Sequence, residues 1–216
     1  MNSRDTILHR VRTECAKLPP AAAPQVPEVW PRERPTPATM AERFAKELAA
    51  VQGEVIRCVS IDDAKRRLDE LIEQAVWTSL GGMDRPIVRE VTAELRPGLV
   101  HWAASDWQPR RMAELSVSVI TADVLLADTG SCVIDCGTPQ DRLLCYLPPA
   151  CVVIARVDQL AEHLPAAWGT IGPRVAEPDR RGEFVIVTGP SRTADIEKIL
   201  ILGVHGPKRL VVLLIG

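Results

Sequence analysis

The chain has 216 residues, a formal net charge of −2 and a pI near 6.1. This length suffices for one domain with a full hydrophobic core, and a second compact domain would be cramped. The near-neutral charge, with arginines scattered along the chain, excludes the basic surface that nucleic acid binding needs. No apolar run reaches the roughly 18 residues of a membrane span, and no apolar signal core follows Met1, so we expect a cytoplasmic protein.

Residues 1–38 are predicted to form an N-terminal helix followed by a proline-rich linker. Residues 1–17 have the composition of a short amphipathic helix, which we expect to be available for docking on a partner or a second subunit. The compact domain is predicted to span residues 39–216. Between the two, seven prolines favour an extended linker or a surface strap, namely Pro19, Pro20, Pro24, Pro27, Pro31, Pro35 and Pro37.

The first half of the compact domain is predicted to alternate helices and strands. The capping box Thr39-Met-Ala-Glu42 begins a helix that Gly53 ends, and Ser60 caps a second helix. Alternation of this kind indicates a mostly parallel sheet with helices on both faces. The remaining predicted elements here are strands at 54–59, 76–80 (ended by Gly81-Gly82) and 99–103, and helices at 87–95 and 106–115.

The second half adds antiparallel pairing. Two apolar runs, 123–127 and 131–135, are joined by Asp128-Thr129-Gly130 with no room for a helix, which predicts a hairpin. The chain is therefore expected to be an α/β protein with a mixed, mostly parallel sheet flanked by helices. The last predicted elements are strands at 151–155 and 209–215 and helices at 159–168 and 194–202.

The candidate site is built around an apolar run at 184–187, which is typical of a strand buried on both faces. Gly189-Pro190 forces a turn after it, because this pair continues neither a strand nor a helix. The polar residues from Ser191 onward are expected to begin the helix that follows. In open α/β sheets, ligands bind where the carboxyl end of a strand meets the amino end of a helix.

Two interpretations of this loop stay open. In the first, Arg192 offers a bidentate fork to an anion or carboxylate, and Ser191, Thr193 and free N–H groups supply the other donors. In the second, the loop is only a capped helix start in which Arg192 pairs with Asp195 or Glu197. The loop is neither a P-loop nor a dinucleotide fingerprint, because the glycine spacing of those motifs is absent.

The turn Asp128-Thr129-Gly130 is the second part of the candidate site. If the strands at 123–127 and 184–187 are parallel, the turn lies at the same sheet edge and converges with Ser191 and Arg192. An aspartic peptidase also presents Asp-Thr-Gly, but it needs a second carboxylate of the same kind and an all-β fold. A plain hairpin turn is the simpler alternative.

Arg142 and His205 are secondary candidates. Arg142 could reach a carboxylate, although a salt bridge is the simpler account. A predicted helix of about nine residues, ~13 Å long, would place His205 at the opposite edge of the sheet, which favours a structural role in its Gly-rich turn or a subunit contact. No catalytic residue is assigned. The candidate ligand residues are Asp128, Thr129, Gly130, Gly189, Ser191, Arg192, Thr193 and Asp195, with Arg142, Glu197 and His205 as secondary candidates.

The six cysteines stand at positions 15, 58, 132, 136, 145 and 151. Without an export signal, free thiols are expected rather than disulfides. Four of them follow the spacing C-x3-C-x8-C-x5-C, which matches neither a zinc knuckle nor a common iron–sulfur run. We therefore expect small buried hydrophobic residues and no metal site.

The stretch Thr188-Gly-Pro-Ser-Arg-Thr-Ala-Asp-Ile-Glu197, followed by Leu202-Gly-Val-His-Gly-Pro207, resembles the signature of the lactate-utilisation protein C family, the YkgG-type LUD domain. Ala127-Asp-Thr-Gly130 and the segment from Arg142 to Pro149 resemble the same family. The resemblance covers about residues 40–216 in order. It implies a fold similar to that of glucosamine-phosphate isomerase, ribose-phosphate isomerase and the CoA-transferases. It also implies a place beside two iron–sulfur proteins in a complex that oxidises L-lactate to pyruvate, with the clusters on those partners and no cofactor in this chain.

Three functions follow from these observations. The first is an accessory subunit of such a complex, which binds a small carboxylate or other anion at the 189–195 loop. The second is a stand-alone isomerase or CoA-transferase-like enzyme, suggested by the fold alone. The third is a structural or regulatory module without a small ligand. Whether the chain is an enzyme by itself stays open at this point, because no complete catalytic set is recognisable in the sequence.

Overall fold

The computed structural model describes residues 3–17, 30, 33, 35–175, 183–194, 200–203 and 205–216. The chain divides into two compact units, Met1–Arg32 and Glu33–Gly216. The first contains the predicted N-terminal helix, α1 (Ser3–Cys15), in which no residue is buried. Most of the proline-rich stretch lies outside the described residues. No helix among the described residues has the length and apolar character needed to cross a membrane.

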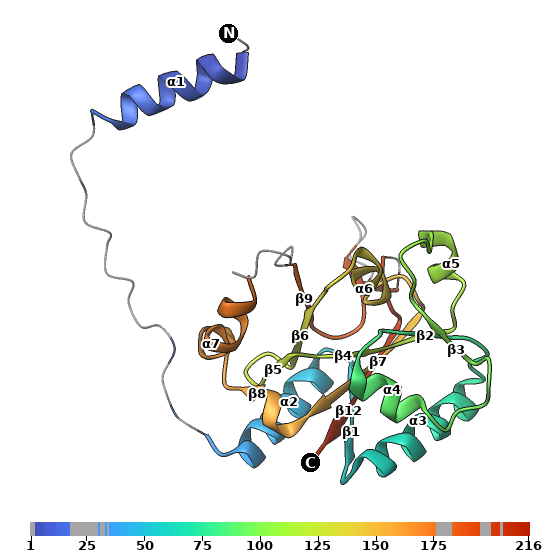
Figure 1. Cartoon of the computed structure of the whole chain (residues 1–216). Coiled ribbons are helices and arrows are strands. Elements are labelled where there is room, and N and C mark those ends of the chain that lie inside the picture. Colours follow the sequence, from blue (N-terminus) through green and yellow to red (C-terminus); the bar gives the residue numbers. More distant parts are fainter. Residues whose placement is uncertain are drawn as a thin grey trace. The chain divides into compact units, whose positions relative to one another are not determined.

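The second unit is built on a six-stranded sheet in which every pair of neighbouring strands is parallel. The strand order is β1-β12-β7-β4-β2-β3 (Figure 1). The predicted parallel sheet is thereby confirmed, including its last strand. The strands are β1 (Glu54–Cys58), β2 (Leu80–Gly82), β3 (Val100–Trp102), β4 (Val117–Thr121), β7 (Ala150–Arg156) and β12 (Arg209–Ile215).

Alternate residues of the central strands supply two separate cores, because successive side chains of a strand point to opposite faces. Val152 and Ile154 pack with α3 (Ile61–Ala75) and α4 (Pro86–Thr92) on one face. Cys151, Val153 and Ala155 pack on the other face, against a second sheet and three helices, α2 (Pro37–Ala50), α5 (Pro109–Ala113) and α6 (Pro139–Leu144). Both faces of β7 and β12 are therefore buried and mostly apolar, as expected for strands at the centre of a parallel sheet.

The second sheet contains the predicted hairpin, which is confirmed. Its strand order is β8-β5-β6-β9, with β5 (Val124–Leu126) antiparallel to β6 (Ser131–Asp135). The outer strands are β8 (Leu160–Ala161) and β9 (Phe184–Val187). The outer face of this sheet is covered by α7 (Leu164–Val175), whose Ala167 and Ile171 form a third, smaller core with the hairpin.

Several predicted boundaries shift for identifiable reasons. Helix α2 begins at Pro37 rather than at Thr39, because the hydroxyl of Thr36 accepts the N–H of Thr39 at 3.2 Å and Pro37 needs no N–H partner at this position. The strand predicted at 76–80 is instead β2, which begins at Leu80 and contains Gly81 and Gly82. A Cβ at Gly81 would lie 2.5 Å from Leu115 Cδ1 and 2.8 Å from Leu144 Cδ2, so both leucine side chains would have to move.

One strand lies where the sequence predicted part of a helix, and one short helix lies where it predicted a loop. The helix predicted at 159–168 begins only at Leu164, where His163 Nδ1 accepts the N–H of Ala166 at 3.0 Å, and β8 precedes it. The polar loop predicted after Gly137 contains α6, capped by Thr138 and Asp141 in a capping box.

The predictions around the candidate loop need the largest correction. Strand β9 is not buried on both faces but stands at one end of the second sheet with Ile186 48% exposed. The helix predicted at 194–202 is wrong, because β10 (Arg192–Ala194) and β11 (Leu200–Leu202) form an antiparallel pair. The β-branched and apolar residues that end this stretch favour extended backbone, and Gly203, with a φ of 73°, turns the chain after them.

One prediction tests how tightly the hairpin turn is held. Gly130 has a φ of 64°, and a Cβ there would lie 2.3 Å from the backbone nitrogen of Leu48 in α2. Gly98 has a φ of 80° with nothing within 4 Å of its Cβ position. We expect Gly98→Ala to cost about 1–2 kcal/mol from backbone strain alone. Gly130→Ala should cost a further ~1–3 kcal/mol, because α2 must move away.

Urea unfolding midpoints of the two variants measure this difference. Equal midpoints would show that α2 does not hold the turn.

Candidate functional site

Three strand ends meet at the edge where the predicted site residues lie. Strands β5 and β9 are both antiparallel to β6, so they run in the same direction although they are not neighbours. The turn after β5 and the loop after β9 therefore lie at the same edge, on either side of Ser131 at the start of β6. The condition for the predicted convergence, that these two strands run parallel, is met. The convergence of Asp128 and Thr129 with Ser191 and Arg192 stays a prediction.

A chain of hydroxyl groups connects the three strand ends. The Thr129 and Ser131 hydroxyl oxygens are 2.8 Å apart, and those of Ser131 and Thr188 are 2.7 Å apart. The Thr129 hydroxyl also donates to the Asp128 carboxylate at 3.3 Å. Ser131 is only 2% exposed, whereas Thr129 and Thr188 are exposed. The chain therefore runs from solvent to a buried hydroxyl and back to solvent.

The last turn of α2 forms the floor beneath these segments. Besides Gly130, Gly189 also packs against it, because a Cβ at Gly189 would lie 2.8 Å from the carbonyl oxygen of Val51. The carboxyl end of a helix carries partial negative charge and offers no free N–H groups. Residues 192–194 form β10 in place of the predicted helix start, so the polar groups described at this edge are the Asp128 carboxylate and the hydroxyls of Thr129, Ser131 and Thr188.

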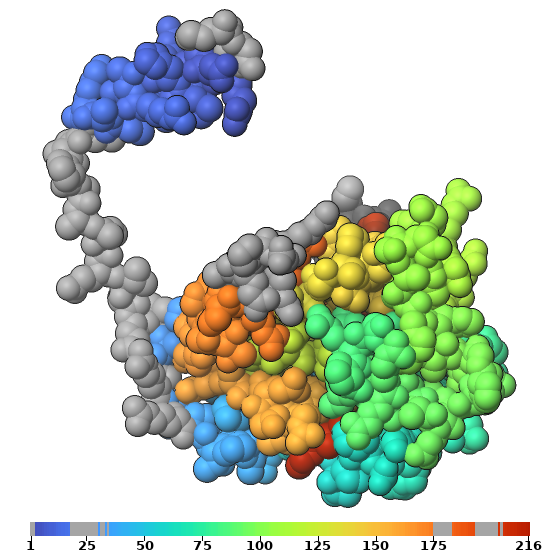
Figure 2. Space-filling model, viewed as in Figure 1, coloured from blue at the N-terminus to red at the C-terminus, as the bar shows by residue number. Residues whose placement is uncertain are grey.

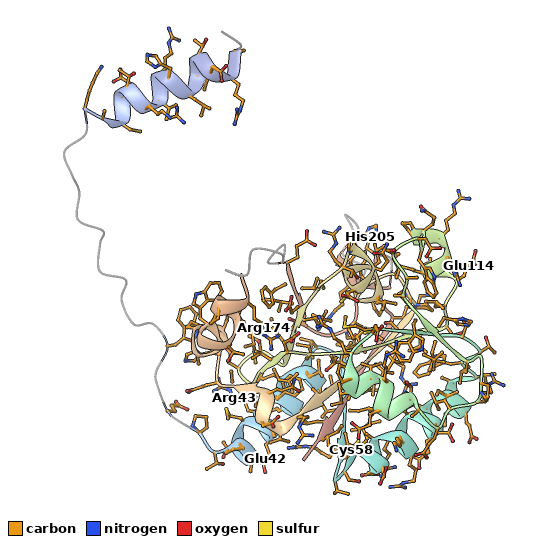
Figure 3. The ribbon with its side chains drawn as sticks, in the orientation of Figure 1. Glu42, Arg43, Cys58, Glu114, Arg174 and His205 are labelled. Atoms are coloured by element: carbon orange, nitrogen blue, oxygen red, sulfur yellow. The ribbon has the colours of Figure 1, made fainter. Side chains whose placement is uncertain are left out.

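The wall of the site next to Ser191 is formed by Gly203, Gly206 and Pro207. The Ser191 N–H donates to Pro207 O at 2.8 Å, and the Gly203 N–H donates to Ser191 O at 2.9 Å. A Cβ at Gly206 would lie 2.9 Å from Ser191 Cβ. The expected separation of His205 from the loop is therefore wrong, because the chain folds back as two strands. His205 is exposed and lies near α6 (Figure 3).

The remaining predicted residues fall into three groups. Arg192 is exposed at the first position of β10, and the backbone of Thr193 pairs with Ile201. Arg142 lies 3.5 Å from a carboxylate oxygen of Glu183, as the salt-bridge account predicted. Asp195 and Glu197 lie outside the described residues, and so does their suggested pairing with Arg192.

The sequence did not identify a charged cluster at the opposite end of the hairpin. Arg174 of α7 is hydrogen-bonded to Asp123 and lies 3.8 Å from an oxygen of Asp135, which is 2% exposed. The Asp135 N–H donates to Asp123 at 2.8 Å, and Arg85 donates to the Asp135 carbonyl at 2.8 Å. The sequence signal that could have revealed this cluster was the position of Asp123 and Asp135 at the open ends of the predicted hairpin. We assign this cluster the task of holding α7 to the second sheet.

A groove of about 580 Å³ opens beside that cluster, between α7, β8 and the start of α2. Acidic groups predominate in its lining, with Asp123, Asp158 and Glu162 against Arg174 alone. Figure 2 shows α7 (orange) and α6 (yellow) on the same face of the second unit. Among the described residues, no group of three or more histidine, cysteine or acidic side chains is arranged to hold a metal ion.

The fold and this edge define the chain as an α/β protein with a parallel sheet, a smaller mixed sheet and a hydroxyl-lined site where strands of the smaller sheet end. The LUD domain model matches residues 41–215. The chain therefore belongs to the LUD domain family, and the resemblance found in the sequence is confirmed.

Similar proteins agree with this assignment. The chain is 36% identical over 107 residues to a Lactate utilization protein C of Bacillus pumilus, which covers 49% of this chain and 45% of that protein. It is 34% identical over 125 residues to the uncharacterized protein YkgG of Escherichia coli, covering 50% of this chain and 51% of that protein. The chain thus spans about half the length of the curated relatives it matches.

The crystal structure of a DUF162 family protein from Deinococcus radiodurans superposes with a TM-score of 0.63 at 16% identity. The match covers 84% of this chain and 99% of that chain. At this level of identity the likeness concerns the fold alone, and it confirms the predicted fold class.

A double-mutant cycle tests the hydroxyl chain. We expect Ser131→Ala and Thr188→Val to show a coupling free energy of about 0.5–1.5 kcal/mol, because each removes the partner of the other. The control cycle combines Ser131→Ala with Ser118→Ala, whose fully buried hydroxyl donates to Ala150 O at 3.4 Å and shares no partner with Ser131. Denaturant unfolding supplies all the free energies. A coupling as small as the control value would contradict the chain.

Proposed function

We propose that this chain is an accessory, lactate-binding subunit of an assembly that oxidises L-lactate to pyruvate, with the iron–sulfur clusters on partner proteins. Membership of the LUD domain family supports this proposal. So does similarity to several relatives named Lactate utilization protein C. The ligand site is the edge formed by the Asp128–Ser131 turn and the Thr188–Arg192 loop, with Gly203, Gly206 and Pro207 beside them.

The observation that carries the proposal is the chain of hydroxyls from Thr129 through Ser131 to Thr188. Each hydroxyl has one proton and two acceptor positions, so the exposed ends of the chain can turn toward a ligand as donors or as acceptors. A 2-hydroxy acid presents a carboxylate that accepts hydrogen bonds and a hydroxyl that donates one. Asp128 is an acceptor for that hydroxyl, while Thr188 and Arg192 are donors for the carboxylate.

The charge around the site favours a ligand of this kind over a phosphate compound. The Asp128 carboxylate and the carboxyl end of α2 both repel an anion. A phosphate monoester dianion carries a second negative charge and no P–OH proton, so its phosphoryl group increases this repulsion and only accepts hydrogen bonds. A single carboxylate with a neighbouring hydroxyl meets Arg192 at one end and Asp128 at the other. The site therefore suits a small monoanion that also donates a hydrogen bond.

The role assigned to the chain is binding and positioning rather than electron transfer. Lactate oxidation removes two electrons and two protons, and the proposal assigns the electrons to the clusters of the partners. Ser131 and its neighbours then orient the substrate, and Asp128 is the group of this chain closest to the substrate hydroxyl in the proposed pose.

Ligand binding by the purified chain is the first test. We expect sodium L-lactate to raise the melting temperature, since a ligand at about 100 times its Kd stabilises the native state by ~2.7 kcal/mol. Arg192→Ala should remove the shift, because it deletes a donor to the carboxylate. Ser131→Ala should reduce the shift, because the Thr129 and Thr188 hydroxyls lose the buried partner that orients them. Arg57→Ala, at an exposed arginine of β1, is the matched control and should keep it. Sodium chloride at equal ionic strength must produce no shift, and an equal shift in Arg192→Ala would contradict the site.

Reconstitution is the second test. We expect no dye reduction by L-lactate with the chain alone, and reduction once the chain is mixed with iron–sulfur proteins that co-purify with it under anaerobic conditions. Arg192→Ala should reduce this rate at least about tenfold if the lost charge-assisted bonds contribute ~1.5–3 kcal/mol. A rate that is the same with and without the chain would rule out the proposed subunit role.

A further inference from the structure

Strand β9 stands at one end of the second sheet, where β6 is its one partner among the described strands (Figure 1). The N–H of Cys136 donates to Glu183 O at 3.0 Å, which marks these two residues as a hydrogen-bonded pair. In an antiparallel ladder, such pairs alternate with pairs that are not hydrogen-bonded. Phe184, Ile186 and Thr188 therefore direct their N–H and C=O groups away from β6. These groups form the outer edge of β9.

The outer edge has no backbone partner among the described residues. Unpaired groups along a strand are a template for another strand, and proteins usually protect such an edge with charged side chains, proline or a bulge. The sequence Phe184-Val-Ile-Val187 contains no charge and no proline, and its pairing with β6 has no bulge. Ile186 is also about half exposed. The outer edge is therefore open, apolar and unprotected.

We propose that β9 pairs with β9 of a second copy of this chain, antiparallel and about a two-fold axis at Ile186. In this register Ile186 lies opposite Ile186 of the second copy, and Phe184 lies opposite its Thr188. All three residues of the outer edge then have partners, whereas a shift by two residues leaves one of them without a partner in the outer edge. The pairing joins two four-stranded sheets into one continuous sheet. It does not depend on which ligand the neighbouring site binds.

The side chains on both faces of β9 suit this arrangement. Residues directly opposite each other in an antiparallel pair have Cβ atoms about 4.5–5.5 Å apart. The two Ile186 side chains therefore cover each other and lose contact with water. On the other face, Val185 lies opposite Val187 of the second copy, and both valines already pack against the main core. The pairing thus extends apolar surface that each copy has already formed.

The charges at the two ends of β9 also favour a second copy in antiparallel orientation. Residues 184–188 carry no charge. Glu183 precedes them, and the exposed Arg192 follows the loop after them. Antiparallel pairing brings the start of each β9 to the end of the other, so Glu183 of one copy lies beside the loop that leads to Arg192 of the other. A parallel pair would instead place the two Glu183 carboxylates side by side, which is repulsive.

The assembly closes after two chains. A two-fold axis uses the same edge on both copies, so no outer edge remains for a third chain. The strand at the opposite end of the sheet, β8, has only two residues and offers no comparable edge. We therefore expect a dimer rather than an open-ended aggregate. Because few residues form the contact, the dimer should be in reversible equilibrium with the monomer.

Analytical ultracentrifugation of the full chain over a range of concentrations tests the dimer. We expect the mass to rise reversibly from that of the monomer to twice that value. Ile186→Lys should raise the dissociation constant at least about tenfold, because two like charges then face each other at the axis. Ile186→Pro should do the same, because proline deletes only an N–H that points away from β6. Val59→Lys is the matched control, at an apolar side chain 86% exposed after β1, and should leave the constant unchanged.

Amide hydrogen exchange identifies the strand that forms the contact. The N–H groups of Phe184 and Thr188 should exchange about tenfold more slowly at high protein concentration than at low concentration, and this comparison needs no variant. In Ile186→Lys they should exchange fast at every concentration. The N–H groups of Val185 and Val187 bond to β6, so they should stay protected in both proteins and report an intact fold. A monomer at every concentration would overturn the proposal, and so would a dimer that leaves the Phe184 N–H unprotected or tolerates Ile186→Lys.

Discussion

The candidate site depends on how closely two loops approach the last turn of α2. Gly130 and Gly189 both lack the side chain that would collide with the backbone of Leu48 or Val51, and both have positive φ angles. Because both glycines contact α2, the turn after β5 and the loop after β9 lie over its last turn. The β6–β9 pairing, in which Cys132 lies opposite Val187, then brings Ser131 within hydrogen-bonding distance of Thr188. The positions of the three hydroxyls are thus a consequence of backbone packing and strand pairing.

The parts of the fold that the sequence predicts are those whose signals are local. The central strands β7 and β12 are apolar on both faces, and helix α3 has its Ser60 cap and an apolar stripe. Strand β9 shows why the rest was not predictable. Four apolar residues in a row fit a strand buried on both faces, but its place at one end of a small sheet depends on pairing with β6, more than 45 residues away. Register between distant strands has no local signature.

The residues of the candidate site likewise divide into those that have a local signal in the sequence and those that have none. Asp128, Thr129 and Ser191 were predictable because turn chemistry and the Gly-Pro break mark loops at strand ends. Ser131 and Thr188 were not predictable. Ser131 directly precedes one apolar run and Thr188 directly follows another, and each acquires a role only through its hydrogen bond across the sheet. The misplacement of His205 followed from one error, the helix predicted in place of β10 and β11. Acidic residues after a turn indicate a helix start, and here the apolar β-branched residues outweigh them.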